Sequence, residues 1–170
     1  MRYHLRTLPE QQNPNKTFLT RIDQISYRVL PTMTNQPPSN PPQPQYGPGH
    51  TPYDTIGGDE AVRALVDAFY NRIRDDSPVL RDMHPPDDRE SREKLHEFLS
   101  GWLGGPQLYI EKRGHPRLRM RHMPFPVDQH AVDEWLKCMH AAMDDCSVEE
   151  PLRSFLSERF THTANFMRNR

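Results

Sequence analysis

The amino-acid sequence predicts an all-α fold, and three observations favour this class. From Tyr53 onward, apolar residues recur three and four positions apart, which is the spacing of one buried helix face. Capping residues, glycines and prolines separate the segments that show this spacing. No segment shows the strict alternation of apolar and polar residues that is typical of a half-buried strand. We therefore expect two pairs of helices, joined by an irregular segment rich in proline.

The first long helix is expected to begin after the Gly57–Gly58 pair, with Asp59 as its N-cap. Its apolar face consists of Val62, Leu65, Val66, Phe69 and Ile73. A short helical turn is expected over residues 77–83. The His-Pro-Pro run at residues 84–86 ends this turn, because proline cannot continue a helix.

The second long helix is expected from about Asp88 to Leu103, where a Gly-Gly-Pro run ends it. Its apolar side consists of Leu95, Phe98, Leu99, Trp102 and Leu103. Residues 106–126 contain too many prolines and glycines for another long helix, although one helical turn is expected near residues 117–122.

The third long helix is expected to begin at Asp128, and its apolar stripe consists of Val132, Trp135, Leu136, Met139 and Met143. The Ser-Val-Glu-Glu sequence at residues 147–150 has the pattern of a capping box, which predicts the start of the fourth helix. The apolar face of the fourth helix consists of Leu152, Phe155, Leu156, Phe160 and Ala164.

Residues 1–52 are expected to form a disordered, proline-rich extension of a helical domain at residues 53–170. Residues 31–52 contain eight of the 18 prolines and almost no aliphatic side chains. Because Met33 begins a short polar tail that resembles the start of a protein, we interpret residues 1–32 as an upstream extension that the native gene product lacks.

Composition excludes several function classes. Lys and Arg number 22 and Asp and Glu number 23, so the weak net field gives no reason to expect nucleic acid or an anionic membrane as partner. No stretch approaches 18 apolar residues, and the first 20 residues lack the apolar run of a signal peptide, so the cytoplasm is the expected location. Cys138 and Cys146 lie about 12 Å apart along one expected helix, and we expect free thiols.

The nine histidines show neither an HExxH motif nor another zinc spacing, and the absence of a CxxC pair removes zinc-ribbon and covalent-haem signals. His122 differs from the others by its context, the run GHPRLRMRHMPFPV. It ends one short helical turn among apolar residues, and a proline follows closely, so the imidazole is expected to point into an apolar space. A lone histidine is nevertheless more often a surface or structurally satisfied residue than a metal ligand.

Five collinear runs resemble the group II truncated haemoglobins. They are YDTIGG, FYNRI, FLSGWLGGP, GHPRLRMRHMPFPV with Tyr109 upstream of it, and DEWLKCMHAAM, and the resemblance covers residues 53 to about 165. It implies a truncated globin, which is a two-over-two helical sandwich around haem b, with His122 as the proximal iron ligand.

The resemblance also assigns polar donors to the distal side. It places Tyr70 and Trp135 at the family's distal tyrosine and tryptophan, where a phenol O–H and an indole N–H would hold dioxygen tightly. From spacing alone, the favoured interpretation of both residues is that they are large core side chains, and the resemblance reverses that preference. His84 occupies a position that the family usually fills with tyrosine or phenylalanine. An imidazole there could donate to the ligand, remain neutral, or coordinate the sixth iron position.

Other positions match the family's cofactor surroundings. Ser91 and Leu95 match positions that face the ligand, and Lys94, Tyr109 and Arg121 are candidates for the haem propionates. Lys94 and Arg121 are also explained as solvated surface charges. The apolar candidates for the porphyrin surface, each of which is also an ordinary core residue, are Phe69, Phe98, Trp102, Phe125 and Met139.

These assignments imply a haem protein that binds dioxygen and other diatomic ligands. Tight binding suits redox turnover, either nitric oxide dioxygenation or peroxidase-type chemistry, although storage or sensing of oxygen stays open. The sequence contains no GxGxxG motif for a flavin or nicotinamide, so a reductase would be a separate protein, and a homodimer is a further partner hypothesis. The alternative is a haem-free helical interaction module with a proline-rich docking tail, which the lack of a PxxP pair flanked by Arg weakens.

Overall fold

The computed structural model describes residues 46–170, and this part of the chain is helical without any extended strand. Its helices are α1 (Pro52–Ile56), α2 (Gly58–Asp76), α3 (Pro78–Asp82), α4 (Arg89–Trp102), α5 (Leu108–Arg113), α6 (Leu118–His122), α7 (Gln129–Asp145) and α8 (Leu152–Met167). The all-α class is therefore confirmed, and so are the four long helices that the apolar spacing predicts.

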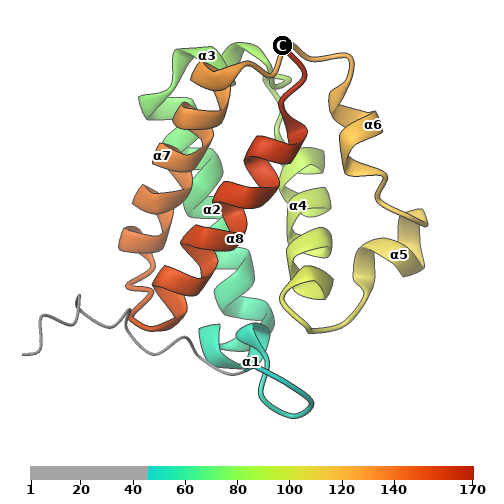
Figure 1. Cartoon of the computed structure of the whole chain (residues 1–170), viewed down its shortest axis with the longest axis vertical. Helices are drawn as coiled ribbons and strands as arrows, with labels where there is room; N and C mark the ends of the chain where they lie inside the picture. The colour runs from blue at the N-terminus through green and yellow to red at the C-terminus, as the bar shows by residue number, and fades with distance from the viewer. Residues whose placement is uncertain (1–45) are drawn as a thin grey trace, which may run out of the picture. The chain divides into compact units, whose positions relative to one another are not determined.

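The four long helices form two layers. Helices α7 and α8 lie side by side in one layer, and α2 and α4 lie behind them in the other (Figure 1). Helix α2 contacts both α4 and α7, so it joins the layers, while α5 packs on α4 and α6 packs on α8. The two-over-two arrangement places the short helices α5 and α6 along one side of α4 (Figure 1).

The core lies where the apolar faces of these helices meet. All five residues predicted for the buried face of α2 are buried, and those of α4, α7 and α8 pack in the same cluster except Val132, which is buried outside it, and Ala164, which is half-buried. The most deeply buried side chains are Val62, Leu65, Val66, Phe69, Leu103, Val132, Cys138, Met139, Met143 and Leu156. Cys138 and Cys146 are free thiols, as expected.

Two helix starts show why the chain folds locally as it does. Asp128 caps α7, because its carboxylate accepts a 2.8 Å hydrogen bond from the backbone N–H of Ala131, as predicted. Thr51 and Asp54 form a reciprocal capping box at α1, in which each side chain accepts from the other's backbone N–H.

The prediction that Asp59 caps the first long helix is wrong. Helix α2 begins at Gly58, and its N-cap is Gly57, whose φ of 113° lies in the left-handed region that favours glycine. Gly57 also ends α1, so one residue serves two helices. Asp59 lies inside the first turn of α2, where its carboxylate is 2.9 Å from Nε2 of His96 on α4. The Asp59 carboxylate therefore contacts a residue 37 positions away and does not cap the helix, and the local sequence does not indicate this contact.

The capping box predicted at residues 147–150 is also wrong. Helix α8 begins at Leu152, and Ser147 has a φ of 53°, which does not suit an N-cap. The Glu150 carboxylate instead accepts a 3.1 Å hydrogen bond from the backbone N–H of Ser154 in the first turn of α8. The acidic residue of the motif thus satisfies one exposed helix donor, while the serine takes no part.

Helix α5 is an element that the sequence analysis missed. It lies in the segment expected to be irregular, and it is fastened to α4 through Glu97, whose side chain is only 1% exposed. The Glu97 carboxylate accepts from Lys112 at 2.9 Å and from Arg113 at 2.5 Å. Burial raises the pKa of Glu97, but the hydrogen bonds from Arg113 and Lys112 outweigh it and hold that pKa below its usual range.

Replacing Glu97 by Gln is therefore expected to lower the free energy of unfolding at pH 7 by about 1–3 kcal/mol, because the buried charged hydrogen bonds are lost. The Glu97 pKa is lower in the folded chain than the value of about 4.3 expected when unfolded, so its stabilisation is complete above that pH. It disappears as the pH falls through the folded value. Urea unfolding between pH 3 and pH 7 checks this, and E97Q should lose less stability with acid than the wild type.

Glu158→Gln, on the exposed side of α8, is the matched control and should follow the wild type at every pH. Equal acid sensitivity in E97Q and the wild type would contradict the assignment.

Most of the expected N-terminal extension lies outside the described residues. This holds for residues 1–45, including the interpretation of residues 1–32 and most of the proline-rich segment. The last residues of the expected extension, from Tyr46 onward, pack on the helical domain. The Tyr46 ring lies edge-on to Phe155 of α8 with 4.7 Å between centroids. Where the domain begins stays a prediction.

Candidate functional site

His122 is the last residue of α6, and a hydrogen bond fixes its imidazole. Nδ1 lies 2.7 Å from the backbone carbonyl of Leu118. Because a carbonyl can only accept, Nδ1 carries the proton of the neutral ring and Nε2 keeps its lone pair. Histidines that bind metals commonly have this arrangement, since the second hydrogen bond fixes both tautomer and orientation.

The backbone around His122 is held by the C-terminal segment. The Asn169 amide donates to the carbonyl of His122 at 3.0 Å and to that of Phe125 at 3.1 Å. Arg119 of α6 donates to the carbonyl of Phe166 at the end of α8. Helix α6 makes only one turn and would not be stable alone, so these contacts fix the position of His122. The sequence analysis missed Asn169, because no local pattern links it to residue 122.

Large apolar side chains beside His122 are open to solvent. Met120, Met123 and Phe125 are exposed, which is unusual for a contiguous group of this size in a folded domain. Three of the apolar residues of the run GHPRLRMRHMPFPV are thus exposed, and the apolar space expected around the His122 imidazole stays a prediction. An apolar surface around a single open imidazole nitrogen suits a flat apolar group that carries a metal.

A second group of site residues forms an aromatic cluster, to which α2 contributes Phe69 and Tyr70. The rings of Tyr70 and His84 meet edge-on with 5.5 Å between centroids. Phe69 adjoins Tyr70 at 5.4 Å and Trp135 of α7 at 5.1 Å. The structure thus brings Tyr70, Trp135 and His84 into one cluster, although they come from three segments of the chain.

Tyr70 is 6% exposed, and its environment keeps the phenol protonated. Burial raises the pKa of Tyr70 to about 12, against smaller lowering effects of Ser91 and Arg92. At neutral pH its hydroxyl is therefore available as a hydrogen-bond donor. Ser91, at the start of α4, lies close enough to hydrogen-bond this hydroxyl, and its predicted position facing the ligand stays a prediction.

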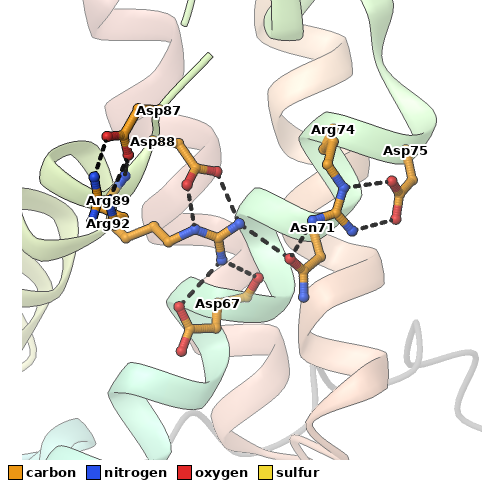
Figure 2. Close-up of polar contacts among 8 residues, drawn as sticks. All are labelled: Asp67, Asn71, Arg74, Asp75, Asp87, Asp88, Arg89 and Arg92. Atoms are coloured by element: carbon orange, nitrogen blue, oxygen red, sulfur yellow. Dashed lines mark hydrogen bonds and ion pairs between the residues drawn. The ribbon is translucent and has the colours of Figure 1, made fainter. Parts of the chain in front are cut away.

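Arg92 links the first turn of α4 to α2, as Figure 2 shows. Its guanidinium donates to both carboxylate oxygens of Asp88 at 2.9 Å, to the carbonyl of Asp67 at 2.9 Å and to Asn71 at 3.1 Å. It also lies 5.3 Å from the centroid of the Tyr70 ring. Arg92 therefore sets the spacing between Ser91 and Tyr70. The sequence analysis did not identify it, because its partners lie up to 25 residues away.

The three propionate candidates occupy different surroundings. Lys94 pairs with Glu90 at 2.8 Å on the half-exposed side of α4. Arg121 is exposed and donates to the carbonyl of Pro116 at 3.0 Å. Tyr109 is buried, with its ring edge-on to Phe98 at 6.3 Å. Lys94 and Arg121 thus keep their charged groups at the surface, whereas Tyr109 is buried.

A pocket lies between α4 and α5, and Tyr109 is one of its lining residues. Its volume is about 170 Å³, and Phe98, Trp102, Tyr109 and Pro116 are among the lining residues. Two of the predicted apolar candidates, Phe98 and Trp102, therefore face open space. Phe69 and Met139 are instead completely buried in the core, and Leu95 is half-buried against it.

The donor set fits haem. A single imidazole nitrogen can hold iron firmly only when a cofactor supplies the remaining ligands, as a porphyrin does. Within residues 46–170, no cluster of three or more His, Cys, Asp or Glu side chains is placed to hold a metal ion. No helix in the same range is both long enough and apolar enough to cross a membrane. A two-layer helical fold with an oriented histidine and a cluster of polar aromatic side chains fits a globin-type protein.

The chain belongs to the bacterial-like globin family, whose model matches residues 51–169. It is 44% identical over 120 residues to "Group 2 truncated hemoglobin YjbI" of Bacillus subtilis, which covers 71% of this chain and 89% of that protein. The family's members are haem proteins that bind dioxygen and other diatomic ligands, and membership implies the same for this chain.

Solved structures of truncated haemoglobins share the fold. A cold-adapted truncated haemoglobin from Pseudoalteromonas haloplanktis is 43% identical with a TM-score of 0.68, covering 71% of this chain and 98% of its own. A truncated oxygen-avid haemoglobin from Bacillus subtilis is 44% identical with a TM-score of 0.67, covering 70% of this chain and 99% of its own. The resemblance predicted from the five sequence runs is confirmed.

Proposed function

We propose that His122 is the protein ligand of the iron in haem b, and that Tyr70 and Trp135 hydrogen-bond dioxygen on the opposite face of the porphyrin. The observation that carries the proposal is the orientation of His122, whose Nδ1 is bound to the carbonyl of Leu118 and whose Nε2 is left open. His84 shares this arrangement through the carbonyl of Leu80, but its ring packs on Tyr70, which we assign to the opposite face of the porphyrin. His96 has both ring nitrogens occupied, by Arg63 and Asp59.

The distal donors support tight retention of dioxygen. When bound, haem supplies an iron that takes diatomic ligands and can exchange one electron. Negative charge that develops on the outer oxygen would be stabilised by the protonated phenol of Tyr70 and by the indole N–H of Trp135, both in a largely apolar surrounding. The relative from Bacillus subtilis described as oxygen-avid supports the same reading.

Retention of this kind favours redox turnover over carriage, since a carrier must also release its oxygen. In one reaction, one molecule of nitric oxide and one molecule of dioxygen would form one nitrate ion, and the haem iron would supply the one electron that this requires. Alternatively, the same donors would polarise the O–O bond of a peroxide. A separate reductase would return the electron, because the sequence contains no flavin or nicotinamide motif. The free thiols of Cys138 and Cys146 support a reducing compartment such as the cytoplasm.

The test uses the full chain loaded with haem and oxygenated. Mixing it with nitric oxide should oxidise the haem and yield one equivalent of nitrate, measured by ion chromatography. Nitric oxide that replaces dioxygen without forming nitrate would exclude this turnover, and oxidation by added peroxide would then be measured in its place.

Replacing His84 by Ala is expected to leave the ferric absorption spectrum in the same high-spin, water-bound form as the wild type. The His84 ring packs edge-on against Tyr70, and coordination of iron through Nε2 would require this contact to break, whereas the hydrogen bond from Nδ1 to the carbonyl of Leu80 could remain. His130→Ala, at an exposed position on α7, is the control. A low-spin wild-type spectrum that becomes high-spin in H84A would show that His84 coordinates the iron.

A further inference from the structure

The side-chain amide of Asn169 binds the turn that follows His122 with both of its ends. Nδ2 donates to the carbonyls of His122 and Phe125 at 3.0 and 3.1 Å, and Oδ1 accepts from the backbone N–H of Val127 at 3.2 Å. A carbonyl can only accept and a peptide N–H can only donate, so these three partners determine which end of the amide faces which group. Both N–H donors of one side chain are thus used on the segment that begins at His122.

The backbone around Asn169 is bound to the same region. Its own N–H donates to the carbonyl of Val127 at 2.9 Å. Arg119 of α6 donates to the carbonyls of Phe166 and Arg168. The segment that carries Asn169 therefore lies along the connection between α6 and α7, as the position of the C-terminus in Figure 1 shows.

Helix α6 needs contacts of this kind to hold His122 in place. It has five residues, and none of them is buried. The carbonyls at the end of a helix have no partner within it, and the Asn169 amide binds the carbonyl of the last residue of α6. The imidazole of His122 is itself bonded to the first residue of α6, through Nδ1 and the carbonyl of Leu118. A movement of this single turn would therefore change the direction in which Nε2 points.

We propose that Asn169 is a positioning residue for the iron ligand, which sets the direction of the His122 imidazole and thereby the strength of its bond to the iron. The inference rests on the proposed function, because it takes His122 as the ligand. Groups that orient a metal-binding histidine usually contact the ring, and their loss typically costs about 10-fold to 100-fold in metal affinity. Asn169 acts instead through the backbone of the ligand, 47 residues away in the chain.

The experiment measures the iron–imidazole bond and the retention of haem in the full chain loaded with haem. Asn169→Ala removes all three side-chain hydrogen bonds. The iron–imidazole stretching band of the ferrous protein without added ligand, recorded by resonance Raman spectroscopy, should broaden and move to lower frequency. Transfer of haem to an excess of apomyoglobin should become about 10-fold faster, at the lower end of the range for groups that contact the ring.

Two further variants give the chemical and the positional control. Asn169→Asp keeps the shape of the side chain but turns an oxygen toward the carbonyls of His122 and Phe125, so its effect should exceed that of Asn169→Ala. Asn165→Ala removes an amide that donates to the carbonyl of Thr161 within α8, and it should match the wild type in both measurements. The circular dichroism of every variant should keep the helical signal.

A change of ligand separates positioning from a general loss of structure. In His122→Gly with added imidazole, the iron ligand is no longer attached to the chain, so the orientation of α6 cannot act on the bond. Adding Asn169→Ala to this variant should leave the Raman band unchanged and the rate of haem transfer within about 2-fold. A purely structural role of Asn169 would speed haem transfer equally with the attached and the free ligand.

The outcomes separate this inference from the proposed function. An unchanged Raman band in Asn169→Ala, or an equal effect of this substitution in the His122→Gly variant, would overturn the positioning role alone. Retention of the wild-type Soret band in His122→Ala would overturn the proposed function, and the positioning role with it.

Discussion

The variant His122→Ala is expected to lose stable haem binding, seen as the loss of the Soret band after expression with added haem and gel filtration. His122 has the ring orientation of a metal ligand, with Nδ1 bound to Leu118 and Nε2 open. Disturbing a group that only orients a ligand typically costs 10-fold to 100-fold in metal affinity, so loss of the ligand itself should exceed about 100-fold.

The controls separate loss of the ligand from loss of the fold. His122→Gly leaves space for an external imidazole, and adding imidazole should restore the Soret band. His162→Ala, on the exposed side of α8, should bind haem like the wild type. The far-ultraviolet circular dichroism of all variants should retain the helical signal. An unaltered Soret band in H122A would contradict the assignment of the iron ligand.

The second large effect is expected on dioxygen release from Tyr70→Phe and Trp135→Phe. A hydrogen bond to a charged group contributes about 1.5–3 kcal/mol, so the loss of either donor should speed dioxygen dissociation by about 10-fold to 150-fold. Tyr70→Phe preserves the ring contacts with His84 and Phe69, so the change is confined to the hydroxyl. Stopped-flow displacement of dioxygen measures the rate.

Carbon monoxide is the internal control, because it develops little negative charge when bound and gains less from these donors. Its dissociation should change much less than that of dioxygen in both variants. If Trp135→Phe releases dioxygen at the wild-type rate while Tyr70→Phe does not, Trp135 is a core residue, which is the alternative that its position beside Phe69 and Phe160 also allows.

The sequence predicted the long helices because their stabilisation comes from apolar faces with a regular period. The buried face of α2 and the Asp128 cap of α7 both follow from residues within one or two turns of each other. The two errors at helix starts have a common cause. Asp59 and Ser147 carry the right chemistry for capping, but tertiary contact and backbone geometry determine what each residue does.

The candidate site was predictable only in part, for a related reason. His122, Tyr70 and Trp135 lie in runs that are specific to a family, so their positions could be matched in order. Arg92 and Asn169 hold the segments that carry Tyr70 and His122 through partners 25 and 47 residues away, and no periodicity or motif indicates such pairs.

The contact between Asn169 and the carbonyl of His122 also bears on how the protein matures. Asn169 is synthesised 47 residues after His122, which takes about 2 to 9 seconds at 5–20 residues per second. Until then, the single turn that carries His122 lacks the hydrogen bond from the Asn169 amide. Haem capture by the nascent chain is therefore disfavoured during translation, and the prosthetic group should be acquired after ribosomal synthesis has passed the end of α8.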